Sequence, residues 1–143
     1  NLNDSAWIAF YCVLCTKISD TGGYFIGLKF GRHKLAKKIS PKKTWEGVVG
    51  GFFFCLVINL IWLNFIDVYI GKQPLPIIHA IVLSFLFPIF GTAGDLVESL
   101  FKRAVKEKDS GESSNPLGGI LDMIDSLLFT APMFYIYLEF LLV

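Results

Sequence analysis

Features that define several common protein classes are missing from this sequence. It contains only three cysteines, which do not suggest the disulfide framework of a small secreted scaffold. Two of them, Cys12 and Cys15, lie one helical turn apart in the apolar run WIAFYCVLC, where packing is favoured over redox chemistry. The glycine-rich segment GGYFIGLKFG is not followed by the Gly-Lys-Ser/Thr of a P-loop. No internal repeat or low-complexity tract appears.

The N-terminus also lacks a basic region that leads into a short apolar one, so we expect no cleavable signal peptide. The first residue is Asn1, and the chain starts almost directly in an apolar segment. We therefore expect residues 1–143 to form the C-terminal membrane domain of a longer polytopic protein.

Apolar residues are far more abundant than a soluble core of this size requires. Among 143 residues, 54% are hydrophobic, and the mean hydropathy is +0.59; this excess indicates a lipid bilayer. Three runs have the roughly 20-residue length of a membrane span, at residues 48–66, 75–93 and 126–143. A fourth, from 6 to about 30, is interrupted by Lys17 and Asp20, a break tolerated only where protein or water covers it. The expected fold class is an all-α integral membrane protein with about four transmembrane helices.

Basic residues are distributed unevenly over the connections between these runs. The connection at 31–44 contains no acid and these basic residues: Arg32, Lys34, Lys37, Lys38, Lys42 and Lys43. The connection at 67–74 has one Asp and one Lys, and that at 102–112 is again rich in basic residues. By the positive-inside rule, the first and third connections are cytoplasmic and the middle one is outside. Lys37 and Lys108 are then predicted on the cytoplasmic side, and Lys72 and both termini on the other.

Glycines recur at the spacing of a helix-packing face. Gly23, Gly27 and Gly31 repeat every fourth residue, and Gly47 pairs in the same way with Gly51. In lipid such ridges let helix backbones approach closely. We interpret these glycines as packing faces.

Carboxylates gather where two of the apolar runs meet the third connection. An ionisable side chain at the end of a membrane-length run is costly and therefore suggests a site. Asp95 follows one run, and Asp122 and Asp125 lie one helical turn apart before the next. Mg²⁺ takes one or two carboxylates plus phosphate oxygens, so Asp95 and Asp122 are the predicted metal ligands. Gly118-Gly119, just before this helix start, would let the chain turn and a phosphate come close.

Further polar groups are expected on the same side of the membrane. On a helix, most of a set that begins at Asp95 shares one face: Glu98, Ser99, Lys102 and Arg103. The segments DTG at 20–22 and SPKKTWE at 40–46 face the same side and can add phosphate and nucleotide contacts. Two ordinary explanations stay open: the charges are simply solvated, or Lys42 and Lys43 snorkel to the lipid surface.

Three motifs, in order along the chain, carry a resemblance to a known family. The first is DTGGYFIG at 20–27, and the second is SPKKTWEG at 40–47. The third begins with Gly94-Asp95-Leu96 and Glu98-Ser99 and continues with Lys102-Arg103, Lys108-Asp109, Gly118-Gly119, Asp122 and Asp125. On these residues the chain resembles the phosphatidate cytidylyltransferases, also called CDP-diacylglycerol synthases, over nearly its whole length.

The chain departs from the family pattern in two places. The family commonly has Pro-Gly-His before the paired glycines, where this chain has Asn115-Pro116-Leu117. It often has Arg between the paired aspartates, where Met123 stands here. No imidazole is therefore available at that place, whereas the metal carboxylates and Lys102 are unaffected.

The resemblance implies transfer of a cytidylyl group from CTP to phosphatidate, giving CDP-diacylglycerol and pyrophosphate in phospholipid biosynthesis. The expected cofactor is Mg²⁺, and a second cation such as K⁺ beside it stays open. Lys102, Arg103 and Asp125 are the expected catalytic residues, beside the metal ligands. The expected substrate-binding residues are Asp20, Lys42, Lys43, Ser99, Lys108, Asp109, Gly118 and Gly119.

The implied location is a bacterial cytoplasmic membrane, with the catalytic loops on the cytoplasmic face. Membrane lipids are the expected surroundings, no nucleic acid is expected as a partner, and a homodimer stays open. Two other functions also stay open: a CTP-dependent lipid or polyprenol kinase of related architecture, and a non-catalytic transporter-type segment. A transporter more often places charges midway along its spans.

Overall fold

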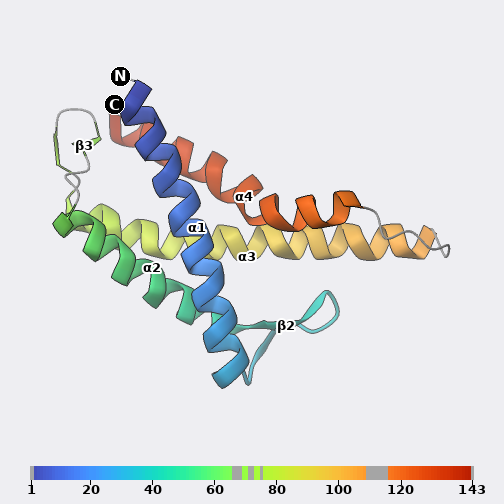
Figure 1. Cartoon of the computed structure of the whole chain (residues 1–143). Helices are drawn as coiled ribbons and strands as arrows, with labels where there is room; N and C mark the ends of the chain where they lie inside the picture. Colours follow the sequence, from blue (N-terminus) through green and yellow to red (C-terminus); the bar gives the residue numbers. More distant parts are fainter. Residues whose placement is uncertain (1, 66–68, 71–72, 75, 109–115, 143) are drawn as a thin grey trace.

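The computed structural model shows a mostly helical chain with two short β-hairpins (Figure 1). It describes residues 2–65, 69–70, 73–74, 76–108 and 116–142, and the side chains of residues 6–63, 76–104 and 125–140. The helices are α1 (Leu2–Phe30), α2 (Trp45–Phe65), α3 (Ile77–Lys108) and α4 (Pro116–Leu142). One antiparallel hairpin joins β1 (Lys34–Ala36) to β2 (Ser40–Thr44), with Lys34 opposite Thr44. The other joins β3 (Tyr69–Ile70) to β4 (Gln73–Pro74).

Within the described residues, two helices are long and apolar enough to cross a membrane. These stretches are Trp45–Leu63 in α2 and Ile77–Ala104 in α3. Large apolar side chains are exposed on all four helices, for example Phe25, Phe53, Phe85 and Phe140. Such exteriors are unusual for a soluble monomer and suit helices that face lipid. The predicted helical class is confirmed, whereas the number of four spans stays a prediction.

The apolar core lies in the half of the molecule that contains both chain termini (Figure 1). Each helix contributes buried side chains to it, including Tyr11, Trp62, Leu83, Phe87 and Phe134. Cys12 and Cys15 are also buried here as free thiols. The interpretation of this cysteine pair as packing is therefore confirmed.

One buried polar side chain, Asn59 of α2, ties three helices together in this core. Tyr11 Oη donates to Asn59 Oδ1 at 2.7 Å. Asn59 Nδ2 donates to Ser84 Oγ at 2.7 Å and to the Ala80 carbonyl oxygen at 3.2 Å. Because an unpaired amide would be costly at this depth, the network makes Asn59 compatible with the core and links α1, α2 and α3.

The glycine ridges predicted from the sequence form the contact between α1 and α2. A Cβ atom on Gly47 would lie 2.8 Å from the Gly23 carbonyl oxygen and 3.5 Å from Gly27 Cα. Only a residue without a side chain allows the two backbones to approach this closely. The prediction of packing faces is confirmed, and the contact places the start of α2 beside the second half of α1.

The ends of two helices differ from the ends of their apolar runs, and one predicted helix boundary is wrong. The third helix continues past residue 93 to Lys108, in agreement with the helical face predicted from Asp95 to Arg103. The residues there include strong helix formers such as Leu, Lys, Arg, Ala and Glu. The fourth begins at Pro116, which is tolerated in a first turn because its missing N–H has no helical partner there. Gly118 and Gly119 are therefore inside α4, not in a turn before it.

The shape of α4 brings its two halves to different neighbours. Its first half runs along α3, and its second half turns toward the N-terminal half of α1 (Figure 1). Pro132 lies inside α4 and accounts for the bend, because proline removes one backbone hydrogen bond and clashes with the preceding turn. The residues around Asp125 consequently face α3, and those beyond the bend face the core.

Candidate active site

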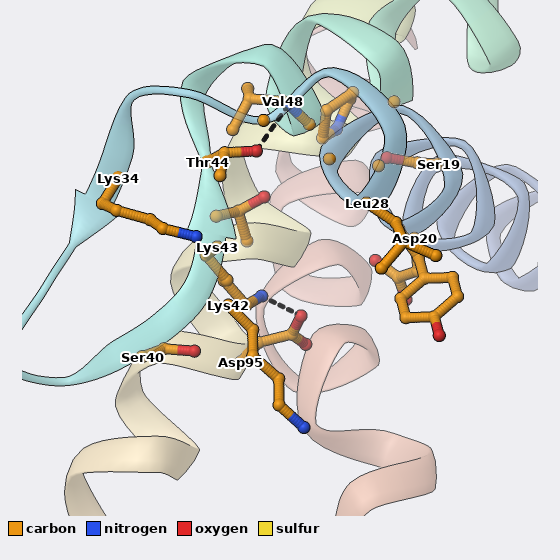
Figure 2. A pocket seen from close by; sticks show the side chains of 18 of the residues that line it. Ser19, Asp20, Leu28, Lys34, Ser40, Lys42, Lys43, Thr44, Val48 and Asp95 are labelled. Carbon is orange, nitrogen blue, oxygen red and sulfur yellow. Dashed lines mark hydrogen bonds and ion pairs between the residues drawn. The ribbon is translucent and has the colours of Figure 1, made fainter.

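A cavity of about 630 Å³ lies at the polar ends of the helices, opposite the apolar core. Side chains from α1, the β1–β2 hairpin, α2 and α3 line it (Figure 2). Its charged lining residues are Asp20, Lys34, Lys42, Lys43 and Asp95. Asp20 and Asp95 are 75 positions apart in the sequence but line the same cavity.

The hairpin that carries the lysines is attached firmly to the start of α2. Thr44 is buried, and its Oγ1 accepts a hydrogen bond from the Gly47 backbone N–H at 3.1 Å, which makes Thr44 the helix N-cap. Glu46 accepts hydrogen bonds from the His33 backbone N–H at 3.1 and 3.2 Å, and its Oε1 lies 2.6 Å from His33 Nδ1. These contacts hold β2, and so place Lys42 and Lys43 at the cavity.

Lys43 forms an ion pair with Asp95 of α3 across the cavity (Figure 2). The two side chains are 22% and 25% exposed, so the pair is largely shielded from bulk solvent. Sequence reasoning assigned Asp95 to a metal and Lys43 to substrate phosphates, and missed their contact with one another. The structure therefore shows a lysine beside the carboxylate expected to hold a cation.

Asp20 of α1 is held by residues from its own helix and from α4. Ser126 Oγ donates a hydrogen bond to Asp20 Oδ2 at 2.8 Å, and Lys17 Nζ lies 3.9 Å from the same oxygen. These contacts give protein partners to Lys17 and Asp20, the two charged residues that interrupt the first apolar run. Ser126 itself was not predicted as a site residue; its only sequence signal is a hydroxyl at the start of an apolar run.

A close crossing of α3 and α4 brings further acidic groups next to Asp95. A Cβ atom on Gly94 would lie 2.5 Å from the Asp125 carbonyl oxygen, so only glycine fits there. Burial raises the pKa of the Asp125 carboxyl, which lies just before the predicted span at 126–143, and the nearby Asp95 carboxylate adds to this shift. Asp95 and Asp125 thus place two carboxyl groups together, and a cation would stabilise their ionised forms.

The donor set around Asp95 suits a hard cation in its chemistry. Two carboxylates are enough for Mg²⁺ when phosphate oxygens and water complete the coordination, and Asp95 and Asp125 supply such a pair. The side chain of the predicted ligand Asp122 lies outside the described residues. In the part of the chain whose side chains are described, no group of three or more His, Cys, Asp or Glu residues is placed to hold a metal.

The other predicted residues lie on the extended part of α3 or beyond it. Lys102 Nζ pairs with Glu98 Oε1 at 2.8 Å, as the helical spacing predicts. Arg103 is exposed and Ser99 is partly buried. The remaining positions cannot be placed at the cavity: the side chain of Lys108 and all of Asp109 lie outside the described residues, and Gly118 and Gly119 are described only as helical backbone.

The fold and the site together define a class: a helical protein of membrane type with a pocket lined by lysines and carboxylates. Comparison with known proteins refines this class. The sequence model of the cytidylyltransferase family matches residues 1–141, and the chain belongs to this family.

Several curated relatives are named phosphatidate cytidylyltransferase. The chain is 40% identical to the one from Bacillus subtilis (strain 168) over 129 residues, which are 90% of this chain and 46% of the relative. It is 44% identical to that of Staphylococcus saprophyticus over 128 residues (90% and 47%) and 39% identical to that of Haemophilus influenzae over 137 residues (95% and 47%). The chain spans about half the length of the curated relatives it matches.

Proposed function

We propose that the protein transfers a cytidylyl group from CTP to phosphatidate, giving CDP-diacylglycerol and pyrophosphate. The observation that carries this proposal is that Asp20, the lysines of the β1–β2 hairpin and Asp95 line one and the same cavity. A pocket with both cations and carboxylates suits a phosphate-rich ligand that also brings a metal ion. The names of the relatives supply the substrates.

In the proposed reaction, an oxygen of the phosphatidate phosphate attacks the α-phosphorus of CTP. A new P–O bond forms there, the bond to the β-phosphate breaks, and pyrophosphate leaves in line with the attack. A phosphate monoester is already anionic at neutral pH, so no strong general base is required. Positioning and charge neutralisation then dominate catalysis.

Basic side chains do most of this positioning in the proposed mechanism. Lys42 and Lys43 reach the cavity from β2 and would neutralise substrate phosphates there. Lys102 and Arg103 on α3 would neutralise phosphates on the side of the third connection, with Lys108 assisting. When substrate enters, the Lys43 ammonium would leave Asp95 and pair with a phosphate oxygen instead.

The carboxylates would hold Mg²⁺ in this proposal. Asp95 and Asp122 are the proposed ligands, and Asp125 supports them from the same turn of α4. When bound, the ion would neutralise charge on the transferring phosphate. Asp20 and Ser99 are proposed substrate contacts.

The proposed location is a bacterial cytoplasmic membrane with the cavity open to the cytoplasmic face. The support is the basic β1–β2 hairpin, which borders the cavity, carries exposed Lys34, Lys37 and Lys38, and is preceded by exposed Arg32. Basic segments are retained on the cytoplasmic side of bacterial membranes. Phosphatidate would then enter the cavity sideways from the lipid.

Turnover of the purified protein with CTP, phosphatidate and Mg²⁺ tests the proposed reaction. Release of pyrophosphate with formation of CDP-diacylglycerol is expected. Formation of CDP would instead identify a CTP-dependent lipid kinase. Consumption of neither substrate would contradict both enzymes and favour a non-catalytic membrane segment.

A further inference from the structure

Ser126 links two charged side chains of α1 to α4. The Ser126 side chain is fully buried, with 0% exposure. Its hydroxyl donates to Asp20 Oδ2 at 2.8 Å and accepts from Lys17 Nζ at 3.4 Å. A hydroxyl carries one proton and can both donate and accept, so the Lys17 contact leaves that proton for Asp20.

Asp20 is a partly buried carboxylate with charged neighbours of both signs. Asp95 and Asp125 repel it electrostatically, whereas the neighbouring lysines attract it. In surroundings of low polarity, a carboxylate that loses a hydrogen bond pays a large desolvation penalty. Without the Ser126 hydroxyl, Asp20 Oδ2 would lose its hydrogen-bond donor from α4, and the carboxylate would no longer be fixed in one orientation.

The surrounding backbone restricts where the carboxylate can lie. A Cβ atom on Gly91 of α3 would lie 3.2 Å from Asp20 Oδ1 and 3.8 Å from Ser126 Cβ. Asp20 Oδ2 accepts the hydrogen bond from Ser126, and Asp20 Oδ1 lies in the space that a side chain at Gly91 would fill. The same Asp20 lines the cavity, so its orientation affects any ligand bound there.

We propose that Ser126 is a positioning residue that fixes the Asp20 carboxylate at the wall of the cavity, where CTP is the proposed ligand. This inference rests on the proposed function, because CTP is the ligand only in that case. A carboxylate repels phosphate and accepts hydrogen bonds from hydroxyl groups. Asp20 consequently faces a neutral donor of the nucleotide, of which a ribose hydroxyl is the chemically suited kind.

The test compares steady-state kinetics of Ser126→Ala, Asp20→Asn and the double variant in the full-length protein. Ser126→Ala is expected to lower kcat/KM for CTP about tenfold or more, the effect of losing a hydrogen bond to a charged group. The loss is expected in KM for CTP, with KM for phosphatidate changed little. Adding Ser126→Ala to Asp20→Asn is expected to cause almost no further loss, because the serine acts only through Asp20.

Thr130→Val is the matched control. Thr130 lies one helical turn further along α4, is also fully buried, and its Oγ1 lies 2.9 Å from Thr16 Oγ1 of α1. This variant removes the same kind of link between α1 and α4 without touching Asp20. It is expected to lower thermal stability while leaving kcat/KM for CTP unchanged within about twofold.

Each outcome decides between the alternatives. If Ser126→Ala behaves like Thr130→Val, or if its effect multiplies with that of Asp20→Asn, Ser126 is a structural residue and the inference is wrong. Ser126→Cys keeps the volume but donates a weaker hydrogen bond, so an intermediate KM supports the inference even if Ser126→Ala does not fold. If the unsubstituted protein releases no pyrophosphate from CTP, the proposed function fails and this inference falls with it.

Discussion

At the scale of single residues, Asp95 is the side chain on which the metal proposal depends. It pairs with Lys43 and lies near Asp125, so it has both a competing cation and a second carboxylate within reach. A divalent ion would compensate the repulsion between the carboxylates and leave coordination positions for phosphate oxygens. The substitutions that test this role change charge and keep shape.

Asp95→Asn and Asp122→Asn are each expected to lower turnover at least about a hundredfold, roughly 2.7 kcal/mol of barrier. The double variant is expected to lose little more, because two ligands of one ion act as a unit. Initial rates of pyrophosphate release at saturating CTP measure this. Losses that multiply would indicate separate roles, and near-normal turnover of Asp122→Asn would end the shared-metal proposal.

Lys43→Gln tests the ion pair itself through stability. The substitution leaves Asp95 without its cation in a largely shielded position, so the free energy of unfolding is expected to fall by about 1–2 kcal/mol. Mg²⁺ is expected to restore part of this loss by taking the place of the ammonium. Thermal unfolding in detergent, with and without Mg²⁺, measures both effects.

Lys42→Gln is the control for this measurement, because Lys42 also lines the cavity but is exposed. Its free energy of unfolding is expected to change by less than about 0.5 kcal/mol. Equal destabilisation by the two substitutions would show that the pairing of Lys43 with Asp95 does not contribute to stability.

At the scale of secondary-structure elements, the contact of α1 with α2 decides where the hairpin lies. The β1–β2 hairpin connects these two helices, and Thr44 caps α2 next to the glycine contact. Separating the helices would therefore move Lys42 and Lys43 away from Asp95. This makes the close approach at Gly47 a requirement of the cavity as well as of the fold.

Gly47→Val is expected to destabilise the protein by about 1–3 kcal/mol, the usual effect of overpacking a tight contact. The added side chain would meet the Gly23 carbonyl oxygen, which is backbone and cannot turn aside. Val49→Leu, on the same helix at a position 53% exposed, serves as the control and is expected to change little. A Gly47→Val protein that unfolds at the same temperature as the control would contradict the glycine contact.

At the scale of the whole molecule, polar and apolar groups are separated along the helices. The apolar core and both termini occupy one end, and the cavity and the basic hairpin occupy the other (Figure 1). This arrangement agrees with a membrane orientation in which the hairpin is cytoplasmic and the β3–β4 hairpin lies on the opposite side. Orientation is a property that accessibility measurements can decide.

Single cysteines at positions 37 and 73 test the orientation. They lie on the two sides of α2, and a membrane-impermeant thiol reagent is expected to label them from opposite faces of the membrane. The native residues Cys12, Cys15 and Cys55 are buried and are expected to give little background. Labelling of both positions from the same side would contradict the topology.

Much of the fold could be predicted because a bilayer leaves the backbone few alternatives. Unpaired peptide groups are too costly in lipid, so a long apolar run has to be helical. The glycine ridges likewise predicted packing faces, and the structure shows that those of α1 and α2 meet each other. The start of α4 was predicted less well, because hydropathy marks where lipid ends and not where helical hydrogen bonding ends.

The sequence by itself determined the helical class, the residues that could take part in binding or catalysis, and the family motifs in which these residues occur. Only the tertiary structure decided which of them touch. Ser126 and Asp20 are 106 positions apart, and Lys43 and Asp95 are 52 apart. No helical or strand period extends over such separations. These pairs exist because close packing at glycines brings the helices together and holds the β1–β2 hairpin beside α3. That proximity is a property of packing.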